Sequence, residues 1–127
     1  MTVALIIEDN ENNLELIRFI LEAAHYKIRY AMTGLEGVRQ ALTIPPDFII
    51  LDIQLPDING LEVLKRIRAH PVGHDIPIIA MTSYAMSGDR ERLLAAGCTS
   101  YIEKPIDPML VIQQIEQAIN KKDNKVR

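Results

Sequence analysis

The segment from Phe48 to Gly60 reads Phe-Ile-Ile-Leu-Asp-Ile-Gln-Leu-Pro-Asp-Ile-Asn-Gly and carries the clearest fold signal in the chain. Four apolar residues run directly into Asp52, which is typical of a strand buried on both faces with a carboxylate at its carboxyl end. Turn residues follow, and Asn59 stands three residues before Glu62 in the spacing of a helix capping box. The segment therefore predicts a strand, a turn and a helix, with Asp52 at the junction.

The composition predicts one globular domain. The chain has 127 residues, of which 48% are hydrophobic and 24% are charged. We place the domain at residues 1–120 and a charged tail at 121–127. The single cysteine cannot form an internal disulfide and no signal peptide is recognisable, so we expect a cytoplasmic protein. No stretch approaches the roughly 20 apolar residues of a membrane span, and a net charge of −3 gives no electrostatic reason to expect a nucleic acid partner.

Short apolar runs recur along the chain, each followed by a stretch long enough for a helix. Their spacing of roughly 20 to 25 residues is that of repeated strand–helix units, which form parallel sheets. The prediction is an α/β fold with a single three-layer, doubly wound, five-stranded parallel sheet. The second and fifth runs alternate polar with apolar residues, so they should form the edge strands. The runs are Val3–Ile7, Lys27–Ala31, Phe48–Leu51, Ile76–Met81 and Ser100–Ile102.

Caps and apolar stripes place a helix after each run. They predict a first helix carrying Leu14, Ile17, Leu21 and Ala24, capped by Asn10, Asn12 or Asn13; a second opened by Thr33 and Glu36; a third from about Gly60 to Arg68; a fourth from about Ser87 to Gly97; and a fifth opened by Asp107 and Pro108.

Polar residues stand where the predicted strands end. The carboxyl ends of parallel strands lie at one edge of a sheet, where open α/β sheets bind ligands. Side chains remote in sequence should therefore meet in one crevice. They are Glu8 and Asp9, Asp52, Thr82 and Ser83, and Glu103 and Lys104.

Three carboxylates in a small volume repel one another unless positive charge lies among them. Lys104 supplies one positive charge, and a hard divalent cation bound by oxygen ligands would supply the rest. Mg²⁺ fits better than Zn²⁺ because no Cys or His is near. A carboxylate beside Mg²⁺, a lysine and a hydroxyl is equipped for phosphoryl transfer, with Asp52 as nucleophile and Thr82 binding a phosphoryl oxygen.

Each of these residues alone has a simpler explanation. Asp52 could be a turn residue, Glu8 and Asp9 could favour the amino terminus of a helix, and Lys104 could be a solvated edge-strand charge. Their joint placement at matching strand ends favours the phosphoryl-transfer site over the separate explanations.

These residues make the chain resemble a response-regulator receiver domain, the phosphoacceptor module of two-component signalling. The resemblance spans nearly the whole chain, from Val3 to about Asn120. The matching features are the acidic pair Glu8-Asp9, the phosphorylated aspartate Asp52, the switch hydroxyl Thr82, the switch aromatic Tyr101, and Lys104 with Pro105.

The resemblance implies a flavodoxin-like fold with strand order 2-1-3-4-5. It implies Mg²⁺ ligands at Asp9, Asp52 and the backbone carbonyl of Gln54, with Glu8 holding a metal-bound water. It also implies a cis peptide bond between Lys104 and Pro105. The family's members are not enzymes in the ordinary sense, since they promote only their own phosphorylation and dephosphorylation.

The resemblance also implies partners. A histidine kinase or a histidine phosphotransfer protein would supply the phosphoryl group, and a downstream target protein would bind the switched surface. We expect that surface on the fourth helix, fifth strand and fifth helix, including Tyr84, Met86 and Tyr101. The chain looks most like receivers of hybrid sensor kinases or single-domain regulators. We expect it to be a monomer or a weak phosphorylation-linked dimer.

Two other functions use part of this pattern. Haloacid-dehalogenase-type enzymes also combine a nucleophilic aspartate, Mg²⁺ and a lysine, but they carry a second aspartate two residues after the nucleophile, where this chain has Gln54. Degenerate receivers act as interaction modules without phosphorylation, and they usually lack an acidic, hydroxyl or lysine position that is present here.

Overall fold

The structure is a computed structural model that describes residues 2–83 and 87–125, and of residues 87–89 and 121–125 it describes the backbone. Strands and helices alternate along these residues. The strands are β1 (Val3–Ile7), β2 (Lys27–Ala31), β3 (Phe48–Asp52), β4 (Ile78–Thr82) and β5 (Ser100–Glu103). The helices are α1 (Glu11–Ala23), α2 (Gly34–Thr43), α3 (Gly60–Arg68), α4 (Ser87–Ala96) and α5 (Pro108–Lys125), with a short 3-10 helix η1 (Pro71–Gly73).

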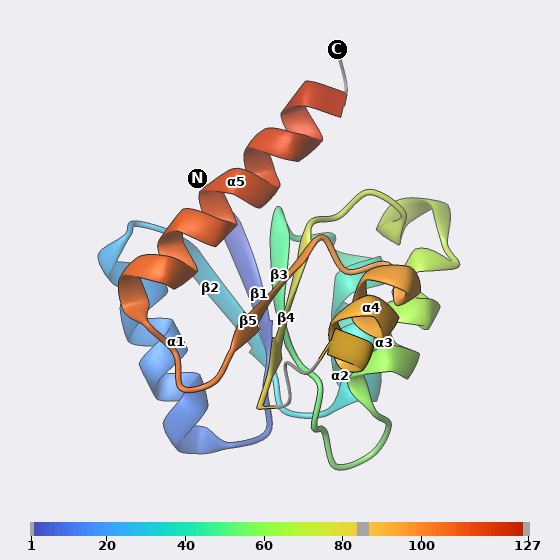
Figure 1. Cartoon of the computed structure of the whole chain (residues 1–127), viewed down its shortest axis with the longest axis horizontal. Coiled ribbons are helices and arrows are strands. Elements are labelled where there is room, and N and C mark those ends of the chain that lie inside the picture. Colours follow the sequence, from blue (N-terminus) through green and yellow to red (C-terminus); the bar gives the residue numbers. More distant parts are fainter. Residues whose placement is uncertain (1, 84–86, 126–127) are drawn as a thin grey trace.

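The strands form one parallel sheet in the order β2-β1-β3-β4-β5, which confirms the predicted fold class and both predicted edge strands. Helices α1 and α5 cover one face of the sheet, and α2, α3 and α4 cover the other (Figure 1). Among the described residues, no helix is long and apolar enough to cross a membrane.

A few element ends differ from the sequence prediction. The fourth strand begins at Ile78, two residues later than the apolar run, because Pro77 has no N–H to donate to a neighbouring strand. Asp52 and Thr82 are the last residues of β3 and β4, at the strand ends where the sequence analysis expected them. Helix α5 continues to Lys125, five residues into the predicted tail, so the domain boundary after residue 120 stays a prediction.

The sheet separates two apolar cores. Every residue of β3 and β4 is buried, as expected for central strands covered on both faces. One core packs α1 and α5 against residues such as Ile6, Ile50 and Met81, and the other packs α2, α3 and α4 against residues such as Leu5, Leu51 and Ala80. Alternate residues of each strand therefore serve opposite cores.

Side-chain caps fix the starts of the first three helices. Asn10 accepts a hydrogen bond from the Asn13 N–H, which selects it from the three predicted cap candidates. Thr33 and Asn59 cap α2 and α3 as predicted. Each cap satisfies a backbone donor that the helix itself leaves unpaired. The loops that leave β1 and β3 are therefore held close to the carboxyl edge of the sheet.

The turn after β3 is tied to two other elements. The Asp57 carboxylate accepts hydrogen bonds from the Gly34 and Leu35 N–H groups at the start of α2, both at 2.8 Å. At Gly60 a Cβ atom would lie 2.6 Å from the Cα of Ile53, so only glycine lets α3 start this close to the end of β3. The turn that follows Asp52 is thus held from both sides.

Arg68 should contribute strongly to stability. Its guanidinium donates to the backbone carbonyls of Gly97 at 2.8 Å and Gly73 at 2.7 Å, which ties the end of α3 to the loop after α4 and to the end of η1. Burial lowers the pKa of this guanidinium. Replacing Arg68 by alanine leaves both carbonyls without this donor, and we expect it to lower the free energy of unfolding by about 3 kcal/mol.

Urea unfolding followed by circular dichroism measures this loss. The matched control is Arg66→Ala, because Arg66 lies on the same helix, is exposed and forms a long 3.9 Å ion pair with Glu62. The control should change stability by less than about 0.5 kcal/mol. Equal effects of the two substitutions would contradict the structural role of Arg68.

Candidate functional site

The predicted site residues come from the carboxyl ends of neighbouring strands, at the lower edge of the sheet in Figure 1. Asp52 is opposite Met81, and Thr82 is opposite Glu103. Backbone hydrogen bonds continue just beyond the strands, since the Ile53 N–H donates to Met81 and the Lys104 N–H donates to Thr82. The carboxyl ends of β3, β4 and β5 are therefore held in register at the same edge of the sheet.

An acidic cluster lies at this edge. The side chains of Glu8, Asp9 and Asp52 each offer an oxygen atom, and these atoms all lie within 4.8 Å of one another. Glu8 and Asp52 are buried, at 0% and 2% exposure, whereas Asp9 is exposed. The cluster thus has a buried floor and one side open to solvent, which is the shape needed by a site that receives a group from outside.

Lys104 forms an ion pair with Asp52. Its Nζ atom donates to Asp52 Oδ1 at 3.1 Å, and the backbone N–H of Gln54 donates to the same oxygen at 3.1 Å. The side chains of this ion pair are only 17% and 4% exposed, so water screens their attraction weakly. The Lys104–Pro105 peptide bond is cis, as the resemblance implied.

The pKa of Glu8 is raised to about 8. Burial is the main cause, and the hydrogen bond to the Asp52 carboxyl group and the negative charge of Asp52 add to it. Lys104 and the Asn10 N–H act in the opposite direction. Near neutral pH the metal-free cluster therefore holds a proton on Glu8, which removes one of its negative charges.

The cluster fits a hard divalent cation. The Glu8 Oε1 atom is buried and has no hydrogen-bond partner among the described residues, although such an atom normally has one. The neighbouring donors are carboxylate oxygens, which Mg²⁺ prefers over nitrogen or sulfur ligands. Asp9, Asp52 and Glu8 could hold such an ion directly or through water, and the predicted ligation by the Gln54 carbonyl stays a prediction.

Thr82 and Tyr101 lie on the same face of the sheet. Tyr101 is opposite Ala80, and Thr82 follows Ala80 by two residues, so their side chains project to the same side. Thr82 is 5% exposed, and Tyr101 is half-buried against the core beneath α4. Two further residues of the predicted switch surface, Tyr84 and Met86, lie outside the described residues.

Arg90 is a neighbour of Tyr101 that the sequence analysis did not predict. Its guanidinium carbon lies 5.4 Å from the centre of the Tyr101 ring. The two residues are on different elements, α4 and β5, and no sequence spacing indicates that they meet. A cation near an aromatic ring is found only when the fold is known.

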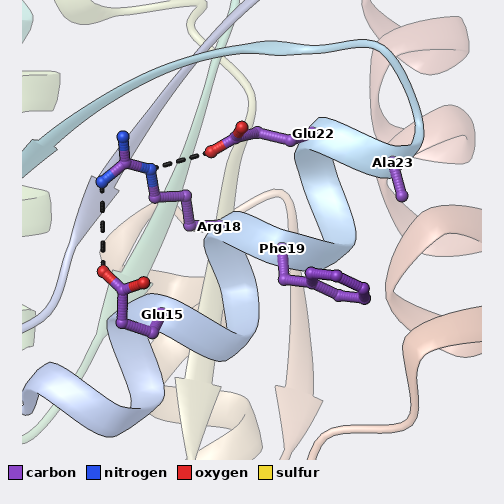
Figure 2. Close-up of a pocket in the computed structure, with 5 residues that line it drawn as sticks. All are labelled: Glu15, Arg18, Phe19, Glu22 and Ala23. Atoms are coloured by element: carbon purple, nitrogen blue, oxygen red, sulfur yellow. Dashed lines mark hydrogen bonds and ion pairs between the residues drawn. The ribbon is translucent and has the colours of Figure 1, made fainter.

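A hollow on the surface of α1 lies apart from this edge (Figure 2). Arg18 spans it between Glu15, at 3.9 Å, and Glu22, at 2.8 Å, while the Phe19 ring points away from these three and is 74% exposed. Exposed ion pairs of this kind contribute little energy. The charged groups of the hollow already pair with one another, so the carboxylate cluster is the better candidate for chemistry.

Comparison with known proteins identifies relatives of the whole fold. The family described as response regulator receiver domain matches residues 4–116. A curated protein of Brucella ovis, described as polar-differentiation response regulator DivK, is 43% identical over 112 residues, which are 88% of this chain and 91% of that protein. The DivK protein of Brucella anthropi matches with the same identity and coverage.

Solved structures agree in both fold and sequence. The receiver domain of the sensor histidine kinase PA1611 from Pseudomonas aeruginosa is 33% identical, with a TM-score of 0.88, over 94% of this chain and 98% of that one. That structure is described as having a magnesium ion coordinated in the active site cleft. A CheY-like receiver domain protein from Methanospirillum hungatei is 28% identical with a TM-score of 0.89, over 98% of both chains.

Proposed function

Because the chain belongs to the response regulator receiver domain family, we propose that Asp52 is the residue on which it accepts a phosphoryl group. Receiver domains are aspartate phosphoacceptors of two-component signalling with an acidic magnesium site, and they are not conventional enzymes. A response regulator works with a histidine kinase. What the family leaves open is which residues of this chain perform each step.

The observation that carries the proposal is the environment of Asp52. Its carboxylate is almost fully buried, is held by Lys104 and the Gln54 N–H, and lies with Glu8 and Asp9 in one oxygen-rich cluster. A structural aspartate would need one or two of these neighbours. A transferred phosphoryl group carries negative charge spread over its oxygens, which the Lys104 ammonium group would offset in part. The surplus carboxylates would hold a divalent cation that offsets the rest.

In the proposed reaction a carboxylate oxygen of Asp52 attacks the phosphorus atom of a partner's phosphohistidine. A phosphorus–oxygen bond forms as the phosphorus–nitrogen bond breaks, and the imidazole leaves with the bonding electrons. The Lys104 ammonium group offsets the negative charge on the phosphoryl oxygens, and the Thr82 hydroxyl donates to one of them. Asp9, Asp52 and the backbone carbonyl of Gln54 would hold Mg²⁺, with Glu8 holding a metal-bound water, and the ion would supply positive charge that offsets the charge on the same oxygens.

The proposed signal is a change of surface. The phosphoryl group binds Thr82 and Lys104 better in one arrangement of the fold, and this difference in affinity shifts the population toward that arrangement. Tyr101 on β5 lies on the same face as Thr82, so the surface of α4, β5 and α5 is where a downstream target protein would read the change. The donor is a histidine kinase or a histidine phosphotransfer protein, and the chain acts in the cytoplasm as a monomer or a weak phosphorylation-linked dimer.

Intact mass spectrometry tests this proposal. After incubation with acetyl phosphate and Mg²⁺, the chain should gain the mass of one phosphoryl group. Asp52→Asn keeps the size of the side chain but removes the nucleophilic carboxylate, so it should show no gain. The matched control is Asp75→Asn, since Asp75 is exposed in a loop and pairs with the exposed His74. It should be labelled like the wild-type chain.

Two outcomes would contradict the proposal. A wild-type chain that gains no mass while a known receiver is labelled in parallel would show that the cluster is a plain ion or protein-binding site. Labelling that persists in Asp52→Asn would show that another residue is the acceptor. Removal of Mg²⁺ with EDTA should abolish most of the labelling, since the cluster would then keep its excess of negative charge.

A further inference from the structure

The contact between Arg90 and Tyr101 joins α4 to the edge strand β5. The guanidinium carbon of Arg90 lies 5.4 Å from the ring centre, within the range of a cation–π attraction. Arg90 is exposed and Tyr101 is half-buried against the core beneath α4, so the Tyr101 ring contacts the core as well as the guanidinium.

Arg90 lies on the side of α4 that faces the sheet. Leu93 follows three residues later, is 3% exposed and packs in the core beneath the helix. Residues three apart lie on the same side of a helix, so Arg90 extends the sheet-facing side of α4 toward the start of the helix. The sheet-facing side of α4 therefore carries the apolar Leu93 near the middle of the helix and the cationic Arg90 closer to its start.

Tyr101 is placed where the state of Thr82 can affect it. The two side chains project to the same face of adjacent strands, two residues out of register. Aromatic side chains can reach such diagonal neighbours. The ring therefore has two directions in which it can find partners, outward to Arg90 and inward along the sheet toward Thr82.

We propose that Arg90 is a positioning residue that holds the Tyr101 ring outward in the unphosphorylated chain through the cation–π contact. The inference rests on the proposed function, because it assumes that Tyr101 moves when Thr82 binds the phosphoryl group. The contact then stabilises the unphosphorylated arrangement selectively. Removing it lowers the free energy needed to reach the phosphorylated arrangement, so the chain binds a phosphoryl group or its mimic more tightly.

The expected size of the effect follows from the strength of such contacts. A cation–π contact at an exposed site is worth about 0.5–1 kcal/mol, which corresponds to about a two- to five-fold change in an equilibrium constant. Arg90→Gln removes the charge while keeping a polar side chain of moderate length. We expect it to lower the half-saturating concentration of beryllofluoride, a mimic of the aspartyl phosphoryl group, by about two- to five-fold in the presence of Mg²⁺.

Two readouts on the full chain test the inference together. The first is NMR of the chain labelled with ring-¹³C tyrosine, in which Tyr101→Phe identifies the Tyr101 signal among the four tyrosines. Without beryllofluoride, this signal should shift in Arg90→Gln and stay close to its wild-type position in Arg90→Lys, which keeps a cation near the ring. The second readout is the beryllofluoride titration of the same samples.

A charge-matched control separates this effect from a general loss of positive charge. Arg66→Gln makes the same substitution at an exposed position of α3, and it should leave both the Tyr101 signal and the titration unchanged. An unchanged Tyr101 signal in Arg90→Gln, or an unchanged half-saturation, would overturn the inference. If the wild-type chain does not respond to beryllofluoride, both the proposed function and this inference are contradicted. If the wild-type chain responds and Arg90→Gln responds in the same way, only the inference is contradicted.

Discussion

Lys104→Ala is expected to slow phosphorylation of the chain by acetyl phosphate about 10²- to 10³-fold, the usual cost of removing one preorganised group that stabilises developing negative charge. Lys104 is the positive group in contact with Asp52, at 3.1 Å, and both side chains are largely buried. Their interaction with a phosphoryl group would therefore be only weakly screened by water. The rate of mass gain, measured at saturating Mg²⁺, reports the loss.

Two controls show whether the loss is specific to the reaction. Lys65→Ala removes an exposed lysine of α3 and should leave the rate unchanged. Because the Lys104 side chain is only 17% exposed, circular dichroism should first confirm that Lys104→Ala retains its secondary structure. A folded Lys104→Ala chain labelled within about three-fold of the wild-type rate would contradict the electrostatic role of Lys104.

The stability of the metal-free chain is expected to fall as pH rises from about 4.5 to about 8, in proportion to the titration of Glu8. The unfolded chain releases the Glu8 proton near the ordinary pKa of 4.5, whereas the folded chain holds it until the pKa of about 8. Between these values the folded state binds more protons, so raising the pH favours unfolding by up to about 1.4 kcal/mol per pH unit. The whole contribution is at most about 5 kcal/mol, present at low pH and lost above pH 8.

Urea unfolding in EDTA, at a series of pH values across this window, measures the slope. Glu8→Gln carries a neutral side chain of the same size, so its free energy of unfolding should not show the pH dependence that comes from Glu8. The control Glu11→Gln, at an exposed position of α1, should keep that pH dependence. Mg²⁺ should reduce the slope, because a bound cation favours the ionised carboxylate and displaces the proton. Identical slopes for the wild-type and Glu8→Gln chains would contradict the assignment.

The strands and the acidic edge could be predicted because their signals are local. Four apolar residues before Asp52 need burial on both faces, and alternation in the second and fifth runs indicated one solvent-facing side. The crossover rules of parallel sheets then bring the strand ends to one edge without any distance being known. For the same reason Glu8, Asp9, Asp52 and Lys104 could be grouped from sequence, and the structure brings them together.

The missed contacts link residues that no local pattern relates. Asp57 caps α2 from a turn 23 residues further along the chain, and Arg68 reaches a carbonyl 29 residues away. Their partners are backbone groups, which every residue carries, so sequence offers no sign of the pairing. The end of α5 was missed for another reason, since the charged run after residue 120 can form either a frayed tail or an exposed helical turn, and here α5 continues to Lys125.

The hydrogen bond from Arg68 to the Gly97 carbonyl holds α4 at its carboxyl end, so the helix can tilt about that end. It anchors the backbone just beyond Ala96, where Gly97 has a positive φ of 113° and the helix turns into β5, while the opposite half of the helix meets β5 through Arg90. Ten residues of helix span about 15 Å, so a tilt of about 10° about the anchored end would carry the far end about 2.6 Å. A side-chain movement at Tyr101 could thus be amplified into a displacement large enough for another protein to distinguish.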